Sequence, residues 1–453
     1  MLYEFRASNF KSFRDEFVFS LKPAQKQKGL DYSVHTEKLG RKTAKALCSA
    51  VIYGPNASGK TNIISAMGVL KNIVLSGSIR NSNGPLTPNA AANLLELIPN
   101  CNNTTREPVS FSIEFSHGNL LFSYSLKINL GLFLEDLFPR EILYEELQVN
   151  GNLIFKREKS QVSCSNLTKI RTFLPKGGTR LDGTRSALIA NSLQREELFL
   201  TNGFKSIVSP LLVARILDWF AHQFLVVCHA ESMTLSPALS SKQNSPVPLP
   251  DNFKEAMKNF GIAGHALGYV AQSEGQGAEL CSFVNDPTKK DKLQGISAKV
   301  FESYGTIRFA QLYPLIERTL RTGAVLAIDE FDASIHPMAL INIVNCFHND
   351  EINIHGAQLV FNTHNPIFLN SNYYRRDEIK FVEKDKATQG SVQYSLSDFG
   401  TKGKDGVRKN EDYLKNYFIN RYGALVSIDF TDVFKHAVEV SGAKEFDNEK
   451  TDA

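Results

Sequence analysis

The chain has 453 residues, of which 42% are hydrophobic and 22% charged, as in an ordinary globular protein with room for two or three folding units. Its formal net charge of +4 is too small for the whole molecule to attract polyanions, so any nucleic-acid surface must be a local patch. The six cysteines form no CxxC or Cys/His pair at metal-binding spacing, which argues against a zinc site and a disulfide framework. The first residues lack a signal-peptide pattern, and no apolar run approaches the roughly 20 residues that cross a bilayer. We therefore expect a cytoplasmic protein without membrane contact.

The first 157 residues predict a strand-rich lobe around one glycine-containing loop. Residues 1–20 alternate like two strands, and Ala50-Val51-Ile52-Tyr53 is a short apolar strand that runs directly into the loop. Apolar residues at 3.6-residue spacing between 63 and 73 predict a helix after the loop. From 109 to 157 the apolar residues alternate with period two, which indicates an antiparallel sheet.

The loop Gly54-Pro55-Asn56-Ala57-Ser58-Gly59-Lys60-Thr61 fits the pattern GxxxxGK[ST] and lies between a predicted strand and a predicted helix, as that motif requires. Its backbone N–H groups and the positive end of the following helix suit the phosphates of ATP. We expect Asn56 and Gly59 to contact the nucleotide, Lys60 to reach the β- and γ-phosphates, and the Thr61 hydroxyl to ligate Mg²⁺. The sequence therefore predicts binding and hydrolysis of ATP.

Residues 158 to 295 are predicted to form an inserted, mainly helical region without the sustained heptads of a coiled-coil arm. Strand and helix patterns alternate again from about 300, with Ala324-Val325-Leu326-Ala327-Ile328 and Gln358-Leu359-Val360-Phe361 predicted as buried parallel strands. A third strand is predicted at Ile379-Lys380-Phe381-Val382. Beyond Asp432 the apolar periodicity is lost, which predicts a disordered tail.

Functional side chains are predicted at the ends of two of these strands. Parallel strands place their carboxyl ends at one sheet edge, where open α/β folds bind ligands. Asp329 and Glu330 follow the first strand, so we expect Asp329 to hold Mg²⁺ through water and Glu330 to polarise the water that attacks the γ-phosphate. His364 follows the second strand, where a neutral imidazole would contact the γ-phosphate. A single histidine at the end of a strand more often has a structural role. Here the neighbouring strand ends also carry candidate functional residues, which favours a functional role for His364.

Ser303-Tyr304-Gly305-Thr306 stands directly before a predicted helix that runs from Ile307 to about Leu320. A serine and a glycine at a helix start form an anion site from backbone N–H groups and a hydroxyl. Considered alone, the segment is an ordinary helix N-cap.

Taken together, these segments resemble the ABC-type ATPases. The start Arg6-Ala7-Ser8-Asn9-Phe10-Lys11-Ser12-Phe13 is similar to the first strand of the SMC/RecF/OLD branch. Over most of its length the chain is most similar to the AAA-family ATPases of the RloA/AbiLi type, which belong to abortive-infection (antiphage defence) loci. Segments that carry this similarity include Arg375-Arg376-Asp377-Glu378-Ile379 and Asn420-Arg421-Tyr422-Gly423-Ala424.

The resemblance implies that Ser303 and Gly305 are the signature motif, which completes the ATP site of the opposite protomer, and that Asp332 lies in the D-loop. It implies an ATP-sandwiched dimer or a higher homo-oligomer that acts as sensor or scaffold for a separately encoded effector, such as a nuclease. The implied fold class is α/β, an ABC-type P-loop NTPase head with an antiparallel β-lobe and an inserted, mainly helical region. The expected parts are an N-terminal ATPase lobe (1–157), the insert (158–295), a C-terminal ATPase lobe (296–432) and a disordered tail (433–453).

Two other functions stay open at this point. A RecF/SMC-like DNA-binding ATPase in DNA repair shares the chemistry of the head, and basic clusters at 41–45, 289–292 and 402–409 leave nucleic acid open as a partner. The energy-coupling subunit of a transporter is disfavoured by the N-terminal strand and by the large insert.

Overall fold

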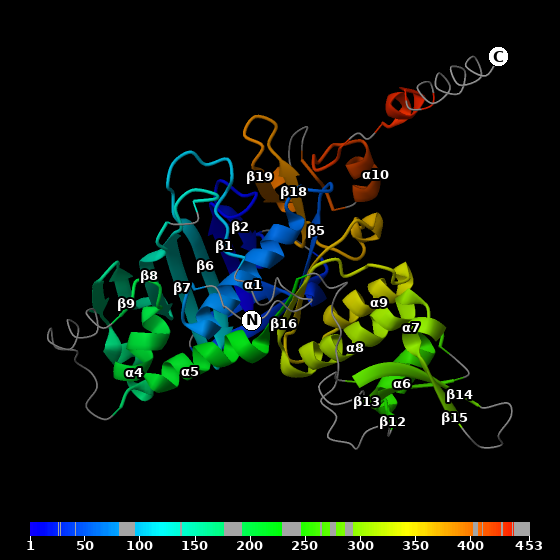
Figure 1. The fold of residues 1–453 in the computed structure, drawn as a ribbon, viewed down its shortest axis with the longest axis horizontal. Helices are drawn as coiled ribbons and strands as arrows, with labels where there is room; N and C mark the ends of the chain where they lie inside the picture. Colours follow the sequence, from blue (N-terminus) through cyan, green and yellow to red (C-terminus); the bar gives the residue numbers. More distant parts are fainter. Residues whose placement is uncertain are drawn as a thin grey trace, which may run out of the picture.

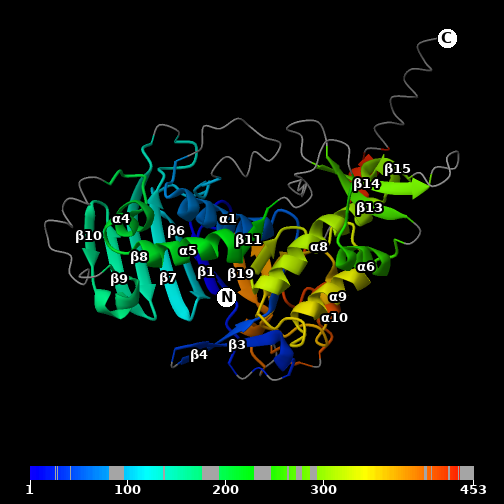
Figure 2. The same cartoon turned by 90° about the horizontal axis from the view of Figure 1, so that it is seen from below.

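The computed structural model describes residues 1–25, 27, 29–40, 42–80, 96–135, 138–175, 193–228, 246–262, 265–271, 278–285, 293–401, 406–409, 411–426, 429–436 and 438. Figure 1 shows an antiparallel sheet at one side, a mixed sheet beside it, and a smaller antiparallel sheet at the other side. Figure 2 shows the same order from below.

The first sheet is antiparallel, with seven strands in the order β10-β9-β8-β7-β6-β1-β2. Its strands are β1 (Leu2–Ser8), β2 (Phe17–Ser20), β6 (Val109–His117), β7 (Leu120–Asn129), β8 (Glu141–Val149), β9 (Asn152–Glu158) and β10 (Gln161–Cys164). Alternate residues of β6, such as Phe111, Ile113 and Phe115, are buried, because successive side chains of a strand point to opposite faces. The predicted N-terminal strand pair and antiparallel lobe are confirmed.

The second sheet has six strands in the order β11-β16-β17-β5-β18-β19. Its strands are β5 (Ser49–Tyr53), β11 (Phe224–Val227), β16 (Val325–Ile328), β17 (Gln358–Asn362), β18 (Ile379–Lys384) and β19 (Ser391–Ser395). All neighbouring pairs are parallel except β18 with β19. The carboxyl ends of β5, β16 and β17 therefore meet at one edge, as predicted.

The remaining strands form two smaller sheets. A ribbon of β3 (Val34–Leu39) and β4 (Lys42–Leu47) precedes β5, and four antiparallel strands lie in the order β12-β13-β14-β15. The latter are β12 (Pro246–Pro248), β13 (Ala266–Ala271), β14 (Ala278–Asn285) and β15 (Leu293–Ser297).

The α-helices with labels are α1 (Lys60–Ser76), α4 (Lys205–Ile207), α5 (Pro210–Asp218), α6 (Asp251–Asn259), α7 (Ala298–Phe301), α8 (Tyr304–Thr322), α9 (Pro337–Phe347) and α10 (Tyr413–Phe418). Short 3₁₀ segments are η1 (Asp31–Ser33), η2 (Leu167–Phe173), η6 (Pro366–Phe368) and η7 (Leu396–Phe399), and π-helical turns are η3 (Leu200–Phe204) and η4 (Trp219–Gln223). Among the described residues, none of the helices combines the length and the apolar character needed to cross a membrane.

The two faces of the second sheet are covered by different elements. Ala50 and Ile52 of β5 belong to a core shared with α1 and the first sheet, whereas Val51 and Tyr53 belong to a core shared with α8 and α9. Because both faces are buried, β5 is a continuous apolar run rather than an alternating one. The same property made these strands recognisable in the sequence.

The region from 158 to 295 differs from the expected mainly helical insert. Its described part contains helices, but also β11 of the second sheet and the four-stranded sheet that begins at β12. The apolar run of β11 follows the turn η4 without a break, and periodicity alone cannot separate a short buried strand from an apolar helix end. The α/β class and the P-loop head stand, while the insert is mixed in character.

The expected disordered tail, 433–453, lies mostly outside the described residues. Its described part is helical, because residues 431–436 form a helical turn in which the Phe434 N–H donates to the Phe430 carbonyl oxygen at 3.0 Å. Apolar side chains at 430, 433 and 434 recur at helical spacing, a pattern too short to stand out in the sequence.

Candidate functional site

The side chain of Lys60 is buried inside the P-loop, at the start of α1. Its Nζ donates hydrogen bonds to the carbonyl oxygens of Gly54 (2.8 Å) and Pro55 (2.9 Å). Burial lowers the pKa of Lys60 to about 8, while the negative charges of Asp329 and Glu330 act in the opposite direction. A buried ammonium group surrounded by the loop backbone is suited to pair with phosphate oxygens.

The N-terminal turn and β19 together support the back of the P-loop. Gly59 has φ 109°, and a Cβ atom there would lie 2.5 Å from Ser391 Oγ and 2.6 Å from Ser12 Oγ, so only glycine fits. Ser391 Oγ donates to the carbonyl oxygen of Ser58 at 2.5 Å and lies 2.7 Å from Ser12 Oγ, which accepts from Asn62 Nδ2 at 2.7 Å. The N-terminal segment that carried the resemblance thus contacts the nucleotide loop directly.

The acidic residue after β16 contacts the P-loop threonine. The Thr61 hydroxyl donates to Asp329 Oδ1 at 3.1 Å, and Asn362 Nδ2 donates to the same carboxylate oxygen. Asn362 Oδ1 in turn accepts from the Glu330 N–H at 2.6 Å. Asn362, the last residue of β17, is 2% exposed and holds both acidic residues in place. Asn362 was not predicted to have a role, although a polar residue at the end of a buried strand is a feature that indicates a site residue.

The oxygen atoms of Thr61 and Asp329 fit a magnesium ion. Among the described residues no group of three or more His, Cys, Asp or Glu side chains could hold a metal. Mg²⁺ does not require such a group, because it keeps several waters and binds through one or two protein oxygens plus substrate phosphates. Ser58 Oγ in the same loop is buried and has no hydrogen-bond partner within the described chain, which leaves a hydroxyl for a polar ligand.

Glu330, His364 and Asn56 have exposed positions around this centre. Glu330 has φ 50°. Both polar groups of its backbone are hydrogen-bonded, since its N–H donates to Asn362 Oδ1 and its carbonyl oxygen accepts from Arg308 Nη2 at 3.2 Å. Burial lowers the pKa of His364, and the positive charge of Lys60 lowers it further. The lowered pKa favours the neutral imidazole. Asn56 lies at the exposed part of the P-loop.

The strand ends are also joined by a chain of hydrogen bonds outside the predicted site. The Thr363 hydroxyl donates to Asp332 Oδ2 at 2.6 Å and accepts from the Asn365 N–H at 2.8 Å. The carbonyl oxygen of Asn365 accepts from the Tyr53 hydroxyl at 2.8 Å. Asp332, the expected D-loop residue, is thus tied to the ends of β17 and β5.

Ser303 and Gly305 lie at the start of α8 and are not hydrogen-bonded to the P-loop of their own chain, as far as the described residues go. Ser303 is exposed, and its hydroxyl caps α8 by accepting from the Thr306 N–H at 3.1 Å. A Cβ atom at Gly305 would lie 2.5 Å from the Ser334 carbonyl oxygen, so glycine allows this helix start to pack against the segment after Glu330. Together with the bond from Arg308, this couples the expected signature motif to Glu330 within one chain.

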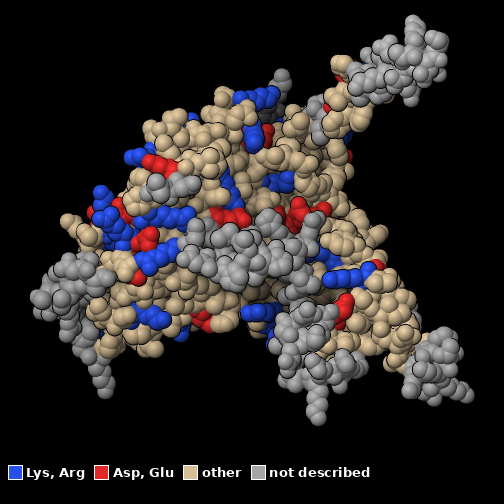
Figure 3. Space-filling model, in the orientation of Figure 1, with Lys and Arg blue, Asp and Glu red and all other residues tan. Residues whose placement is uncertain are grey.

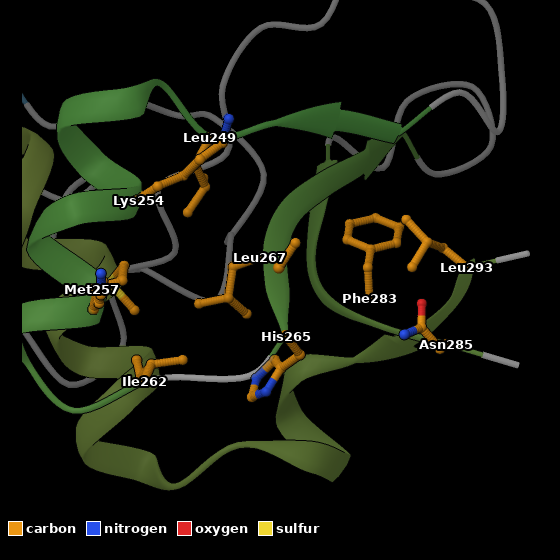
Figure 4. A pocket seen from close by; sticks show the side chains of 11 residues that line it. Leu249, Lys254, Met257, Ile262, His265, Leu267, Phe283, Asn285 and Leu293 are labelled. Atoms are coloured by element: carbon orange, nitrogen blue, oxygen red, sulfur yellow. The ribbon is translucent and has the colours of Figure 1, made fainter. Parts of the chain in front are cut away.

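The insert contacts the expected signature through the preceding residue. Glu302 Oε1 accepts from Ser282 Oγ of β14 at 2.6 Å and lies 2.5 Å from the Nε2 atom of His265. His265 also lines a cavity of about 510 Å³ between α6 and the four-stranded sheet, with Leu267 and Phe283 on its walls (Figure 4). The four-stranded sheet therefore contacts the residue directly before Ser303.

On the face shown in Figure 3, basic and acidic side chains are interspersed. Residues 41, 289–292 and 402–405 of the predicted basic clusters lie outside the described residues, so nucleic-acid binding stays a prediction.

Comparison with known proteins identifies the family. A family model described as "AAA domain, putative AbiEii toxin, Type IV TA system" matches residues 49–168 and 220–370. Among solved structures, the chain is similar to the SMC head domain from Thermotoga maritima, with a TM-score of 0.34, 14% sequence identity and coverage of 87% of this chain and 98% of that chain. No curated protein matches. The matched ranges exceed half of the chain and contain the P-loop, the Asp329-Glu330 pair and His364, so the protein belongs to this AAA-domain family of P-loop ATPases.

Proposed function

We propose that the protein binds and hydrolyses ATP at a site shared by two copies of the chain. The observation that carries this proposal is the division of the site. Lys60, Thr61 and Asp329 are connected within one chain, whereas Ser303 is exposed and has no hydrogen bond to them. A second protomer that places its own Ser303 over the phosphates would complete the site, and two such sites would form by symmetry.

Each residue of the site has a distinct role in this proposal. Lys60 and the backbone N–H groups of the loop bind the phosphates, and the Thr61 hydroxyl and the Asp329 carboxylate hold Mg²⁺. When bound, the metal supplies positive charge that neutralises the phosphate oxygens. Glu330 accepts a proton from the attacking water, and the neutral imidazole of His364 orients the γ-phosphate.

We predict that two inactive variants restore activity when mixed. Lys60→Ala removes the phosphate-binding ammonium group, and Ser303→Asp keeps an acceptor for the Thr306 N–H while placing a carboxylate against the partner's phosphates. In a mixed dimer one site has an intact P-loop from one copy and an intact Ser303 from the other. An equal mixture should therefore hydrolyse ATP at about a quarter of the wild-type rate, since about half of the dimers are mixed and have one working site of two.

The control for this mixture is each variant alone at twice the concentration, measured with the same phosphate-release assay. Thermal unfolding should show both variants folded. If the mixture hydrolysed ATP no faster than the two variants measured separately, the shared site would be refuted. If Ser303→Asp alone hydrolysed ATP like the wild type, Ser303 would not be part of the site.

We further propose that this ATPase is the sensor or scaffold of an antiphage system with a separately encoded effector, such as a nuclease. Support comes from the sequence resemblance to RloA/AbiLi-type ATPases and from the description of its family, which names a putative AbiEii toxin. The contact of His265 and Ser282 with Glu302 supplies a route from the insert to the ATP site.

The defence role predicts that phage plating depends on the P-loop. Cells that carry the gene with its neighbouring genes should yield fewer plaques than cells without them, and Lys60→Ala should raise the count to that of unprotected cells. Lys71→Ala serves as the control, because Lys71 is a partly buried lysine of α1 whose Nζ donates to the Phe224 carbonyl oxygen at 2.7 Å, away from the loop. Equal plating with and without the locus on a broad set of phages would contradict the defence role and leave the ATPase proposal intact.

A further inference from the structure

Two apolar features of the chain, an exposed stripe on a helical turn and a groove between helices, match in the spacing of their residues and in charge. The first is a stripe on the C-terminal helical turn after α10, formed by Phe430, Val433, Phe434 and Val438 and here called the tail stripe. These side chains are 60%, 64%, 65% and 71% exposed, and the ring centroids of Phe430 and Phe434 are 6.1 Å apart. Figure 1 shows this turn (red) beyond α10, projecting away from the sheets. A run of large apolar side chains on one helix face marks an interaction site.

The second feature is a groove of about 820 Å³ formed by α6, α8, α9 and the segment after α9, here called the α8–α9 groove. Figures 1 and 2 both show α8 and α9 side by side. Its apolar wall is formed chiefly by Phe260, Phe309, Tyr313, Ile316, Leu320 and Ile343. Ile352 and Ile354 at its edge are 46% and 63% exposed.

The spacing of apolar residues in the groove matches that of a docked helix. On α8 the apolar groove residues are 309, 313, 316 and 320, which lie on one continuous face of the helix. The tail stripe repeats at 430, 433, 434 and 438, a helical periodicity over 9 residues, which fits within the 12 residues from 309 to 320. Ridges of such spacing on two helices pack into each other's grooves.

The charges beside these residues fit one orientation. Glu317 and Arg321 line the groove one helical turn apart, with their side chains 42% and 70% exposed and only a loose 3.7 Å contact between them. On the tail, Asp432 and Lys435 are likewise about one turn apart and exposed. A tail that runs antiparallel to α8 would pair Asp432 with Arg321 and Lys435 with Glu317. The parallel orientation would instead bring like charges together.

We propose that the tail stripe of one copy docks in the α8–α9 groove of a second copy. This contact joins two different surfaces, so every copy that offers a tail also offers a groove, and the contact can repeat into a ring or a filament. It is separate from the nucleotide site, because none of its residues belongs to the P-loop or to the strand ends. An ATP-dependent dimer joined by such contacts would become a larger assembly.

The test uses two variants of the full chain. The tail variant is Phe430→Asp/Phe434→Asp, and the groove variant is Ala339→Arg/Ile354→Asp. Ala339 lines the groove and is only partly buried, so the arginine fills the groove without removing core packing. Both variants are made in the Lys60→Ala background and studied without nucleotide, so that contact through ATP does not contribute.

We expect sedimentation velocity to show that the Lys60→Ala parent self-associates and that each variant alone self-associates at least ~10-fold more weakly, as when central apolar contacts are removed. An equimolar mixture should form complexes that stop at two copies, because one functional tail and one functional groove remain. Leu211→Asp, at a 63% exposed position of α5, is the control and should associate like the parent.

Three results would overturn the proposal. A parent that stays monomeric throughout the concentration range shows that the tail does not join copies. A mixture that stays monomeric shows that tails pair with tails. A groove variant that associates like the parent shows that the tail binds another surface. Circular dichroism of both variants shows whether they are folded, and the recovery of complexes in the mixture requires that both are.

Discussion

The Glu330→Gln variant should bind ATP with unchanged affinity and hydrolyse it at least ~100-fold more slowly, the usual effect of losing a general base. The amide has the size of the carboxylate but cannot accept the proton of the attacking water. The bond from the Glu330 N–H to Asn362 and the bond from Arg308 to the Glu330 carbonyl oxygen use only the backbone of Glu330, so both remain in the variant. If two copies close around ATP, slow hydrolysis should also make the closed dimer accumulate.

The measurements are single-turnover hydrolysis, binding of a fluorescent ATP analogue, and light scattering with and without ATP. Glu351→Gln is the control, because Glu351 is an exposed glutamate in the turn after α9 and lies at none of the strand ends. A Glu330→Gln protein that turned over at the wild-type rate would exclude Glu330 as the base. Slow hydrolysis without dimer accumulation would leave the base assignment standing and count against closure around ATP.

The parts of the site that the sequence predicted are those encoded locally. Gly54 to Thr61 is a continuous motif, and the apolar runs before Asp329 and His364 are buried parallel strands whose character shows in one sequence window. The shared edge of these strands follows from parallel pairing, which the apolar runs already indicated. Local sequence pattern and sheet geometry were therefore enough to predict that Lys60, Thr61 and Asp329 lie close together.

The parts that were not predicted depend on contacts between distant segments. Ser391 donates to the P-loop at the Ser58 carbonyl oxygen and to Ser12, a residue 379 positions away, and no local sequence pattern predicts either contact. Asn362 links Asp329 to the Glu330 backbone only because β16 and β17 are neighbours in the sheet. The four-stranded sheet of the insert was missed because burial does not alternate along its strands: three consecutive residues of β13 are buried, and no residue of β15 is.

Lys60→Ala should weaken ATP binding by about 100-fold or more, because a charge-assisted hydrogen bond to phosphate is lost in a buried site. Loss of the fold would not explain this weaker binding of ATP, because we expect the variant to be about as stable as the wild type. At pH 7 Lys60 is charged although burial lowers its pKa to about 8, so the folded state carries a desolvated charge that alanine removes. Removing this charge favours the folded state of the variant. The carbonyl oxygens of Gly54 and Pro55 lose their hydrogen-bond donor, however, which offsets this gain in stability. Near neutral pH we therefore expect similar melting temperatures for the variant and the wild type.

The pH dependence of stability checks this argument. The folded-state pKa of Lys60, about 8, lies below the unfolded value of about 10.5, so between these values the unfolded chain binds more protons than the folded one. The wild type should therefore gain stability relative to Lys60→Ala as the pH rises from 8 toward 10, whereas below pH 8 their difference should be constant. Lys71→Ala is the matched control for ATP binding, since burial also lowers the pKa of Lys71 to about 8 and its side chain bonds outside the loop. If Lys71→Ala lost ATP binding and Lys60→Ala kept it, the phosphates would have to bind elsewhere than in the loop that Gly54 to Thr61 form.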